Sequence, residues 1–294
     1  MKKNQIGIIL TLIALVAIVY FAVNYVDIPK TAEILSRADI SLLVLALGLE
    51  TIALVLKTLK WKILIAPKLS NNINFSELFK IQVAGIAISN ITPARIGETT
   101  KCLYMEKYGL KKRFTLLTIL WERLFDVIAI LLFSAFIVSS YGSIVTVVLV
   151  LTILAAFVAY NLDKLAVFFS KLPRLGFLSE LTFHKFSKTT LLKSFVVGLI
   201  AWTFDLLAVA VAFQATGVNL AYVQIMGAYA VSLIVGLIST IPGGFGSLEG
   251  SLYILLKGTY PVATLVAAFI TARLVTIGWV FVLGALAMMT MKKK

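Results

Sequence analysis

The sequence predicts an all-α integral membrane protein, with six transmembrane helices and two oppositely oriented re-entrant helical hairpins that form an inverted repeat. Three observations support this fold class. Hydrophobic residues make up 61% of the 294 residues and charged residues only 14%, whereas soluble domains hold roughly 45–50% and about 25%. The apolar residues gather in stretches long enough to cross a bilayer. Two further apolar stretches run into breaks that contain proline and glycine.

Six stretches have the length of a transmembrane helix, which needs about 20 mostly apolar residues. They are Ile6–Val26, Ile40–Leu56, Phe114–Val138, Ile144–Tyr160, Phe195–Ala215 and Val262–Met291. The first begins after Lys2 and Lys3, as a signal peptide does, but no small-residue cleavage site follows it. We therefore interpret it as a retained first helix.

Two other apolar stretches end at a break. Phe75–Ile91 runs into Pro93-Ala94-Arg95-Ile96-Gly97-Glu98, and Val218–Ile241 runs into Pro242-Gly243-Gly244-Phe245-Gly246-Ser247-Leu248-Glu249-Gly250. A helix, a Pro/Gly break and a short second helix are expected of a hairpin that enters the membrane and turns back. Such backbone is tolerated at membrane depth only where it is buried in protein or lines a wet cavity. The predicted tip residues are Pro93 and Gly97 in the first hairpin, and Pro242, Gly243, Gly244, Gly246 and Gly250 in the second.

The distribution of basic residues supports this topology, because cytoplasmic loops carry an excess of Lys and Arg. With both termini in the cytoplasm, 21 of the 27 Lys and Arg residues lie on the cytoplasmic side, Lys57, Lys60 and Lys101 among them. Counting either hairpin as a full span would place a basic loop on the opposite side. We therefore predict a multi-pass protein of the cell membrane. Its net charge of +14 suits anionic lipid headgroups and does not require nucleic acid.

The two breaks belong to a repeated unit within one membrane domain. The predicted domain covers residues 1–294, with units at 27–161 and 188–291 and hairpins near 75–105 and 220–257. Glu50 or Asp205 lies within a helix before each break. An arginine follows each break: Arg123 comes 25 residues after Glu98, and Arg273 comes 24 residues after Glu249. Three spans separate the two acidic helices, an odd number, so the units should be oppositely oriented, as in many secondary transporters.

Charged residues inside the predicted membrane segments are the strongest functional signal. At a rise of about 1.5 Å per residue, Glu50, Asp205 and Arg273 lie roughly 15–17 Å deep, near the bilayer centre. A charge facing lipid there would cost about 2.5–3.5 kcal/mol, so these residues must pair or face water. The i,i+3 spacing of Arg123 and Asp126 indicates local pairing. Two interpretations stay open: ion pairs that lock the hairpins to the helices, and a polar cavity that binds a substrate.

A cavity of this composition suits a zwitterionic or sugar-bearing phospholipid headgroup. Glycines let a ligand approach the backbone closely, and helix N-termini favour an anion. Arginines can bind phosphate in bidentate fashion, while carboxylates can receive the rest of the headgroup or carry a coupling proton. The predicted binding residues are Glu50, Asn90, Arg95, Glu98, Glu122, Arg123, Asp126, Asp205, Glu249 and Arg273.

Motifs for other chemistry are missing from the sequence. Cys102 and His184 are the single residues of their kinds, so neither a disulfide framework nor a Cys/His metal spacing exists. Gly244-x-Gly246 lacks the third glycine of a dinucleotide fingerprint, and Ser247 does not lie in a Gly-x-Ser-x-Gly elbow. We therefore expect no catalytic residue, no metal, no cofactor and no enzyme activity.

The two break motifs, with Glu122-Arg123-Leu124-Phe125-Asp126 between them and Arg273 after them, resemble the lysylphosphatidylglycerol synthase transmembrane-region family, also called the flippase-like domain family. The resemblance covers nearly the whole chain. It implies a membrane domain that moves or presents a modified lipid, such as an aminoacylated phosphatidylglycerol or a polyprenyl-phosphate glycolipid. Members that make the lysyl lipid carry a soluble aminoacyl-transferase domain after the membrane part. This chain ends at Lys292-Lys293-Lys294, which leaves the transport-like half as the expectation.

The sequence therefore predicts a lipid flippase or scramblase-like transporter, with membrane lipids and anionic headgroups as its partners. A second interpretation is a non-transporting module that docks a separate lipid-modifying enzyme, such as a glycosyltransferase, through Lys111, Lys112 and Arg113. A third is an intramembrane headgroup enzyme with Glu98 and Glu249 as acid and base, for which no nucleophile is evident. A docked transferase and an oligomer both stay open as partners.

Overall fold

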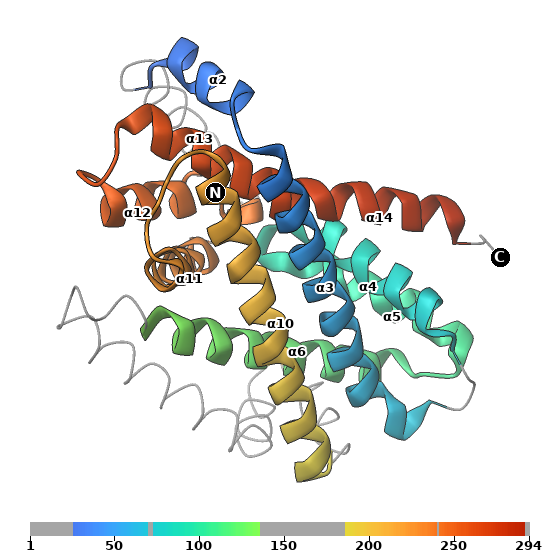
Figure 1. The fold of residues 1–294 in the computed structure, drawn as a ribbon. Coiled ribbons are helices and arrows are strands. Elements are labelled where there is room, and N and C mark those ends of the chain that lie inside the picture. Colours follow the sequence, from blue (N-terminus) through green and yellow to red (C-terminus); the bar gives the residue numbers. More distant parts are fainter. Residues whose placement is uncertain (1–25, 70–72, 136–185, 240, 292–294) are drawn as a thin grey trace, which may run out of the picture.

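The computed structural model describes residues 26–69, 73–135, 186–239 and 241–291, apart from the side chains of residues 93–95. Within these ranges the chain is helical and forms no β-strand (Figure 1). Two of the predicted spans, Ile6–Val26 and Ile144–Tyr160, lie outside the described residues except for Val26.

Three described helices are long and apolar enough to cross a membrane. These are α3 (Ile40–Ile65) with the short 3₁₀ turn η1 (Ala66–Lys68), α10 (Lys188–Ala215), and a continuous run from Val262 to Thr290. In length and composition these helices agree with the corresponding predicted spans. Helix α3 extends beyond the predicted end at Leu56, and Lys60 on this extension is buried. Asp39 caps α3: its side chain accepts hydrogen bonds from the Ser41 hydroxyl and from backbone N–H groups, which lower the pKa of this exposed carboxyl group.

The last long helix contains a wide turn directly after Arg273. It consists of α13 (Val262–Arg273), the π-helical turn η6 (Leu274–Gly278) and α14 (Trp279–Thr290). Such π-helical turns are rare in proteins, and those that occur are often found at functional sites. The indole of Trp279 donates to Thr51 Oγ1 at 2.9 Å, which joins the start of α14 to α3.

Helix α6 (Lys112–Ser134) lies where the span Phe114–Val138 is predicted and carries three charged residues in its apolar part. Residues 136–138 of that predicted span lie outside the described residues. The remaining helices outside the breaks are α2 (Ile28–Ser36) and the 3₁₀ turn η3 (Glu106–Tyr108).

Both predicted breaks interrupt helices. In the first, α4 (Phe75–Asn90) is followed by the 3₁₀ segment η2 (Pro93–Thr99) and α5 (Thr100–Met105). In the second, α11 (Tyr222–Ile238) is followed by η5 (Pro242–Gly244) and α12 (Ser247–Leu256).

Glycine is required at particular points of these breaks. A Cβ atom on Gly97 would lie 2.6 Å from the carbonyl carbon and oxygen of Ile88, because η2 folds tightly back on the end of α4. Gly243, Gly244 and Gly246 have φ angles of 61°, 65° and 80°, which only glycine adopts readily. Gly250, predicted at the tip, instead lies within α12 and has open space beside it.

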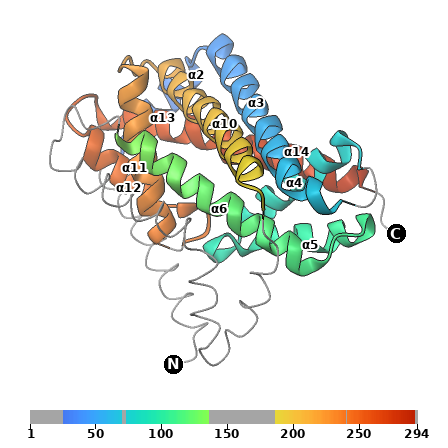
Figure 2. The same ribbon diagram turned by 90° about the horizontal axis from the view of Figure 1, so that it is seen from below.

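The helices pack in matched pairs. Helices α3 and α10 lie side by side along much of their length, as both views show (Figures 1 and 2). The first arm of each break packs against the other half: α4 contacts α14, which continues the Arg273-bearing helix beyond its π-helical turn, and α11 contacts α6, which carries Arg123. The segments η2 and η5 also contact each other. The two breaks therefore meet inside the molecule.

Apolar side chains on the outside of α3 agree with a lipid environment. Val44, Leu45, Ile52, Val55 and Leu59 are exposed along this helix, and soluble proteins rarely expose apolar surface so extensively.

Candidate functional site

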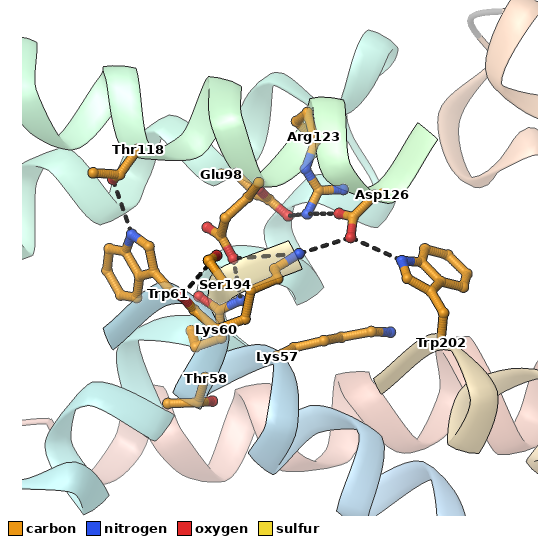
Figure 3. Close-up of polar contacts among 12 residues, drawn as sticks. Lys57, Thr58, Lys60, Trp61, Glu98, Thr118, Arg123, Asp126, Ser194 and Trp202 are labelled. Atoms are coloured by element: carbon orange, nitrogen blue, oxygen red, sulfur yellow. Dashed lines mark hydrogen bonds and ion pairs between the residues drawn. The ribbon is translucent and has the colours of Figure 1, made fainter. Parts of the chain in front are cut away.

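Helix α6 supplies the centre of a buried ion-pair network with the side chains of Glu122, Arg123 and Asp126. Lys60 of α3 places its Nζ atom 2.7 Å from Asp126 Oδ1 and 3.8 Å from Glu122 Oε1. The indole N–H of Trp202, on α10, donates to the same Asp126 oxygen at 2.8 Å. Figure 3 shows Lys60, Arg123 and Trp202 converging on Asp126. One carboxylate thus holds three helices together.

The first break joins this network through Glu98 and Lys101. Arg123 Nη2 lies 2.8 Å from Glu98 Oε1 and 3.1 Å from Asp126 Oδ2. Lys101 Nζ lies 3.1 Å from Glu122 Oε2 and 3.7 Å from Glu98 Oε2, above the Trp61 ring. The predicted pair of Arg123 and Asp126 is therefore present, and Arg123 also binds Glu98 of the first break.

Arg273 makes the equivalent attachment in the second half. Its Nε atom lies 2.5 Å from Glu249 Oε1, while Nη1 donates to the Gly243 carbonyl at 3.0 Å and Nη2 to the Gly244 carbonyl at 3.5 Å. The other Glu249 oxygen accepts from the Gly246 backbone N–H at 2.7 Å. The guanidinium therefore fastens α13 to both the tip and the first turn of α12.

A third charged group lies between α3 and α10. Lys57 forms an ion pair with Asp205 and lies above the Trp202 ring. Glu50 is only 2% exposed, and its Oε2 atom has no hydrogen-bond partner among the described residues. Glu50 thus differs from Asp205, because the nearby Lys57 is bound to Asp205.

These groups surround two adjoining cavities. The smaller, about 70 Å³, is polar, and the larger, about 240 Å³, extends between α6, α10, α11 and η5. Both are lined by Arg123, Asp126, Trp202 and Leu233. The larger cavity continues along apolar side chains, namely Val127, Ile130, Leu237, Ile241 and Leu248. Charged groups and an apolar wall therefore lie next to each other.

Most of the predicted binding residues line the polar cavity: Glu50, Asn90, Glu98, Arg123, Asp126, Asp205 and Arg273. Glu122 and Glu249 are not among its lining residues and instead bind the cations described above. The side chain of Arg95 lies outside the described residues. Within the described part of the chain, no group of three or more His, Cys, Asp or Glu side chains is placed to hold a metal ion.

Three lysines that the sequence places in basic cytoplasmic segments, Lys57, Lys60 and Lys101, are buried by protein and do not form an exposed loop surface. Lys60 is 1% exposed and Lys101 is fully buried. Lys57 keeps only 16% of its side chain exposed. Lysine is almost never buried unless it is paired, and here carboxylates from three other elements provide the pairing. A signal existed for two of them, because Lys57 and Lys60 lie three residues apart at the end of an apolar helix.

A helical chain with several membrane-length helices, apolar outer side chains and a buried charge network defines a multi-pass α-helical membrane protein. Within that class, the chain belongs to the lysylphosphatidylglycerol synthase TM region family, whose sequence pattern matches residues 5–284. This confirms the resemblance noted from the motifs.

Relatives in archaea are similar over most of their length. A UPF0104 membrane protein of Methanocaldococcus jannaschii is 22% identical over 328 aligned residues, covering 99% of this chain and 96% of the relative. One from Methanothermobacter thermautotrophicus is 24% identical, covering 97% of this chain and 94% of its own. One from Pyrococcus horikoshii is 26% identical, covering 80% and 82%. Family membership makes a lipid-related role the expected one.

Proposed function

We propose that the protein is a lipid transporter, not an enzyme, and that it binds a phosphate-containing lipid headgroup at the junction of the two cavities and moves it across the membrane. The observation that carries the proposal is the sharing of Arg123 and Asp126 by a polar cavity and an apolar-walled one. An amphipathic lipid would find both of its parts accommodated there. Drug-sized ligands occupy about 300–1,000 Å³, so a cavity of about 240 Å³ suits a headgroup whose tails stay in the bilayer.

Helix packing supports an inverted repeat of two re-entrant hairpins. Each hairpin would have its first arm on the opposite unit, because α4 packs on α14, the continuation of the Arg273-bearing helix, and α11 packs on α6, which carries Arg123. Each unit also contains a Glu–Arg pair, Glu98 with Arg123 and Glu249 with Arg273. Oppositely oriented units with a site between them can alternate access by rocking against each other.

We assign phosphate binding to Arg123 and a holding role to Arg273. Arg123 keeps 29% of its side chain exposed, lines both cavities, and has no described partner for its Nε atom. All three nitrogens of Arg273 already donate, to Glu249, Gly243 and Gly244. A planar guanidinium with spare donor capacity suits a phosphate, which it can bind with two parallel hydrogen bonds.

The test is headgroup transfer in proteoliposomes with fluorescent short-chain lipids: phosphatidylglycerol, an aminoacylated phosphatidylglycerol, and a polyprenyl-phosphate sugar. We expect Arg123→Lys, which keeps the charge but loses the fork, to slow transfer of one lipid class by at least about tenfold, equal to about 1.4 kcal/mol. Arg37→Lys is the matched control, because Arg37 is exposed and pairs only locally with Glu33. Wild-type rates in folded Arg123→Lys protein would contradict the assignment.

A docking module is the second candidate, and one observation favours it. Lys111, Lys112 and Arg113 are consecutive and exposed at the start of α6, which gives an acidic partner a compact basic surface. Under this function, charge reversal of these three residues would abolish capture of a lipid-modifying transferase, and variants at Arg123 would leave capture unchanged.

A further inference from the structure

We propose that the carboxyl group of Glu50 binds a proton, and that this proton accompanies the anionic lipid headgroup through the transport cycle. The proposal deepens the proposed function. Proton binding by Glu50 concerns one side chain and can be tested without any measurement of transport.

Glu50 is a buried carboxyl group in a polar cavity. Its side chain is 2% exposed and lines the polar cavity from α3, yet Oε2 lacks a hydrogen-bond partner among the described residues. Asp205, across the α3–α10 contact, holds Lys57 as its own partner. An ionised carboxylate that is buried without a partner is strongly disfavoured, and such a group becomes neutral instead.

The charges of the whole site nearly balance. Charged groups reach the same cavity from five elements, with the titratable Tyr229 on α11: Lys57 and Lys60 on α3, Glu98 on η2, Arg123 and Asp126 on α6, Asp205 on α10 and Arg273 on α13. The side chains that α4, η6 and α14 contribute to its lining are uncharged. Their direct partners add Lys101, Glu122 and Glu249. Together with Glu50, the described site holds five cations and six carboxylates. One proton on Glu50 makes it neutral.

Water can reach Glu50. The polar cavity of about 70 Å³ can hold water, since one water molecule occupies about 30 Å³. A hydronium ion from the aqueous phase can pass its proton through this water: one of its O–H bonds breaks, an O–H bond forms on the Glu50 carboxylate, and a neutral water molecule is left. The reverse step releases the proton to water.

Charge couples this proton to the lipid. An anionic headgroup entering a cavity with an uncompensated carboxylate meets repulsion that is strong in a low-dielectric interior. Once Glu50 is protonated, that repulsion is removed, so the headgroup and the proton favour each other's binding by the same factor. The two ligands therefore move in the same direction.

Infrared difference spectroscopy of the full-length protein in phosphatidylcholine bilayers tests proton binding directly, because a protonated carboxyl group has its own carbonyl-stretch band. We expect wild type to show this band, Glu50→Gln to lose it, and Glu33→Gln to keep it. Glu33 is the matched control because its side chain is 54% exposed and pairs with Arg37. If wild type shows no such band at any pH where it stays folded, the proposal is overturned. It is overturned equally if folded Glu50→Gln keeps the band. Should the glutamine variant not fold, Glu50→Asp must shift the band, and an unshifted band excludes Glu50.

Transfer of fluorescent phosphatidylglycerol under an imposed pH gradient tests the coupling. One proton per lipid allows up to about tenfold accumulation per pH unit, because 1.4 kcal/mol corresponds to a factor of ten. Accumulation should be lost in Glu50→Gln and kept in Glu33→Gln. Transfer that ignores the gradient overturns the coupling. A Glu50 band without transfer of any lipid leaves the proton site standing and counts against the transport function.

Discussion

Replacing Lys60 by methionine should destabilise the protein strongly, although the sequence alone places this lysine in a basic cytoplasmic segment. Lys60 is 1% exposed, and its ammonium lies 2.7 Å from Asp126 and 3.8 Å from Glu122. Methionine fills a similar volume, so the main effect is the loss of a buried cation between two carboxylates. Removing one partner of a buried pair costs about 3–5 kcal/mol, since the remaining charge is left uncompensated. Arg123 and Trp202 still bind Asp126, which places the expected loss near the lower limit, about 3 kcal/mol.

The assay is reversible unfolding by denaturant in mixed micelles, with helicity as the signal. Lys60→Met/Asp126→Asn should recover part of the loss, because the second change removes the unpaired charge. Lys62→Met on the same helix is the control. Lys62 lies over the Phe75 ring and is only partly buried, so a change below about 1 kcal/mol is expected. If Lys60→Met unfolds within about 0.5 kcal/mol of wild type, Lys60 does not hold these helices together.

Three further outcomes follow from the same geometry. Gly97→Ala should cost about 1–3 kcal/mol of unfolding free energy, because its Cβ would lie 2.6 Å from the Ile88 carbonyl. Gly48→Ala is the control and should cost nothing, because no atom lies within 4 Å of its added Cβ. Equal effects of the two changes would contradict the tight fold of η2. Trp202→Phe should cost at least about 0.5–1.5 kcal/mol by denaturant titration, since it removes the N–H donor to Asp126 together with part of a buried ring that faces Lys57; an unchanged midpoint would show that this bond contributes nothing. Asp39→Ala should lower the melting temperature at neutral pH. The folded-state pKa of Asp39 is lowered, so its contribution is present above the ordinary carboxyl pKa of about 4 and disappears as the pH falls through the folded value; a difference that persists in acid would argue against a charge effect.

Sequence reasoning predicted the breaks and the Glu–Arg spacing because these depend on local chemistry. Proline and consecutive glycines end helices wherever they occur, so the interruptions at Pro93 and Pro242 could be found without a structure. An arginine and a carboxylate inside apolar segments must find opposite charge, which made Arg123, Glu98, Arg273 and Glu249 evident as a group.

Pairing across the chain could not be predicted in the same way. Lys101 follows a polar break, and nothing near it in the sequence shows that Glu122 will bury it. The same holds for the indole of Trp202, whose partner Asp126 is 76 residues away. A lysine near the end of a span can lie in a cytoplasmic loop or in a buried ion pair. Only the packing of α3 and α5 against α6 decides between these two locations.

Each break's first helix packs on a helix of the other half, and this packing has a consequence for biogenesis. Helix α4 packs on α14, yet α14 is synthesised roughly 190 residues later. At about 5–20 residues per second, α4 therefore waits about 10–40 s for its final neighbour. During that time the face of α4 that will meet α14 needs a temporary apolar partner, either lipid or an insertion factor. Severing the chain between the halves should consequently leave two fragments, each missing one surface that only the other can supply.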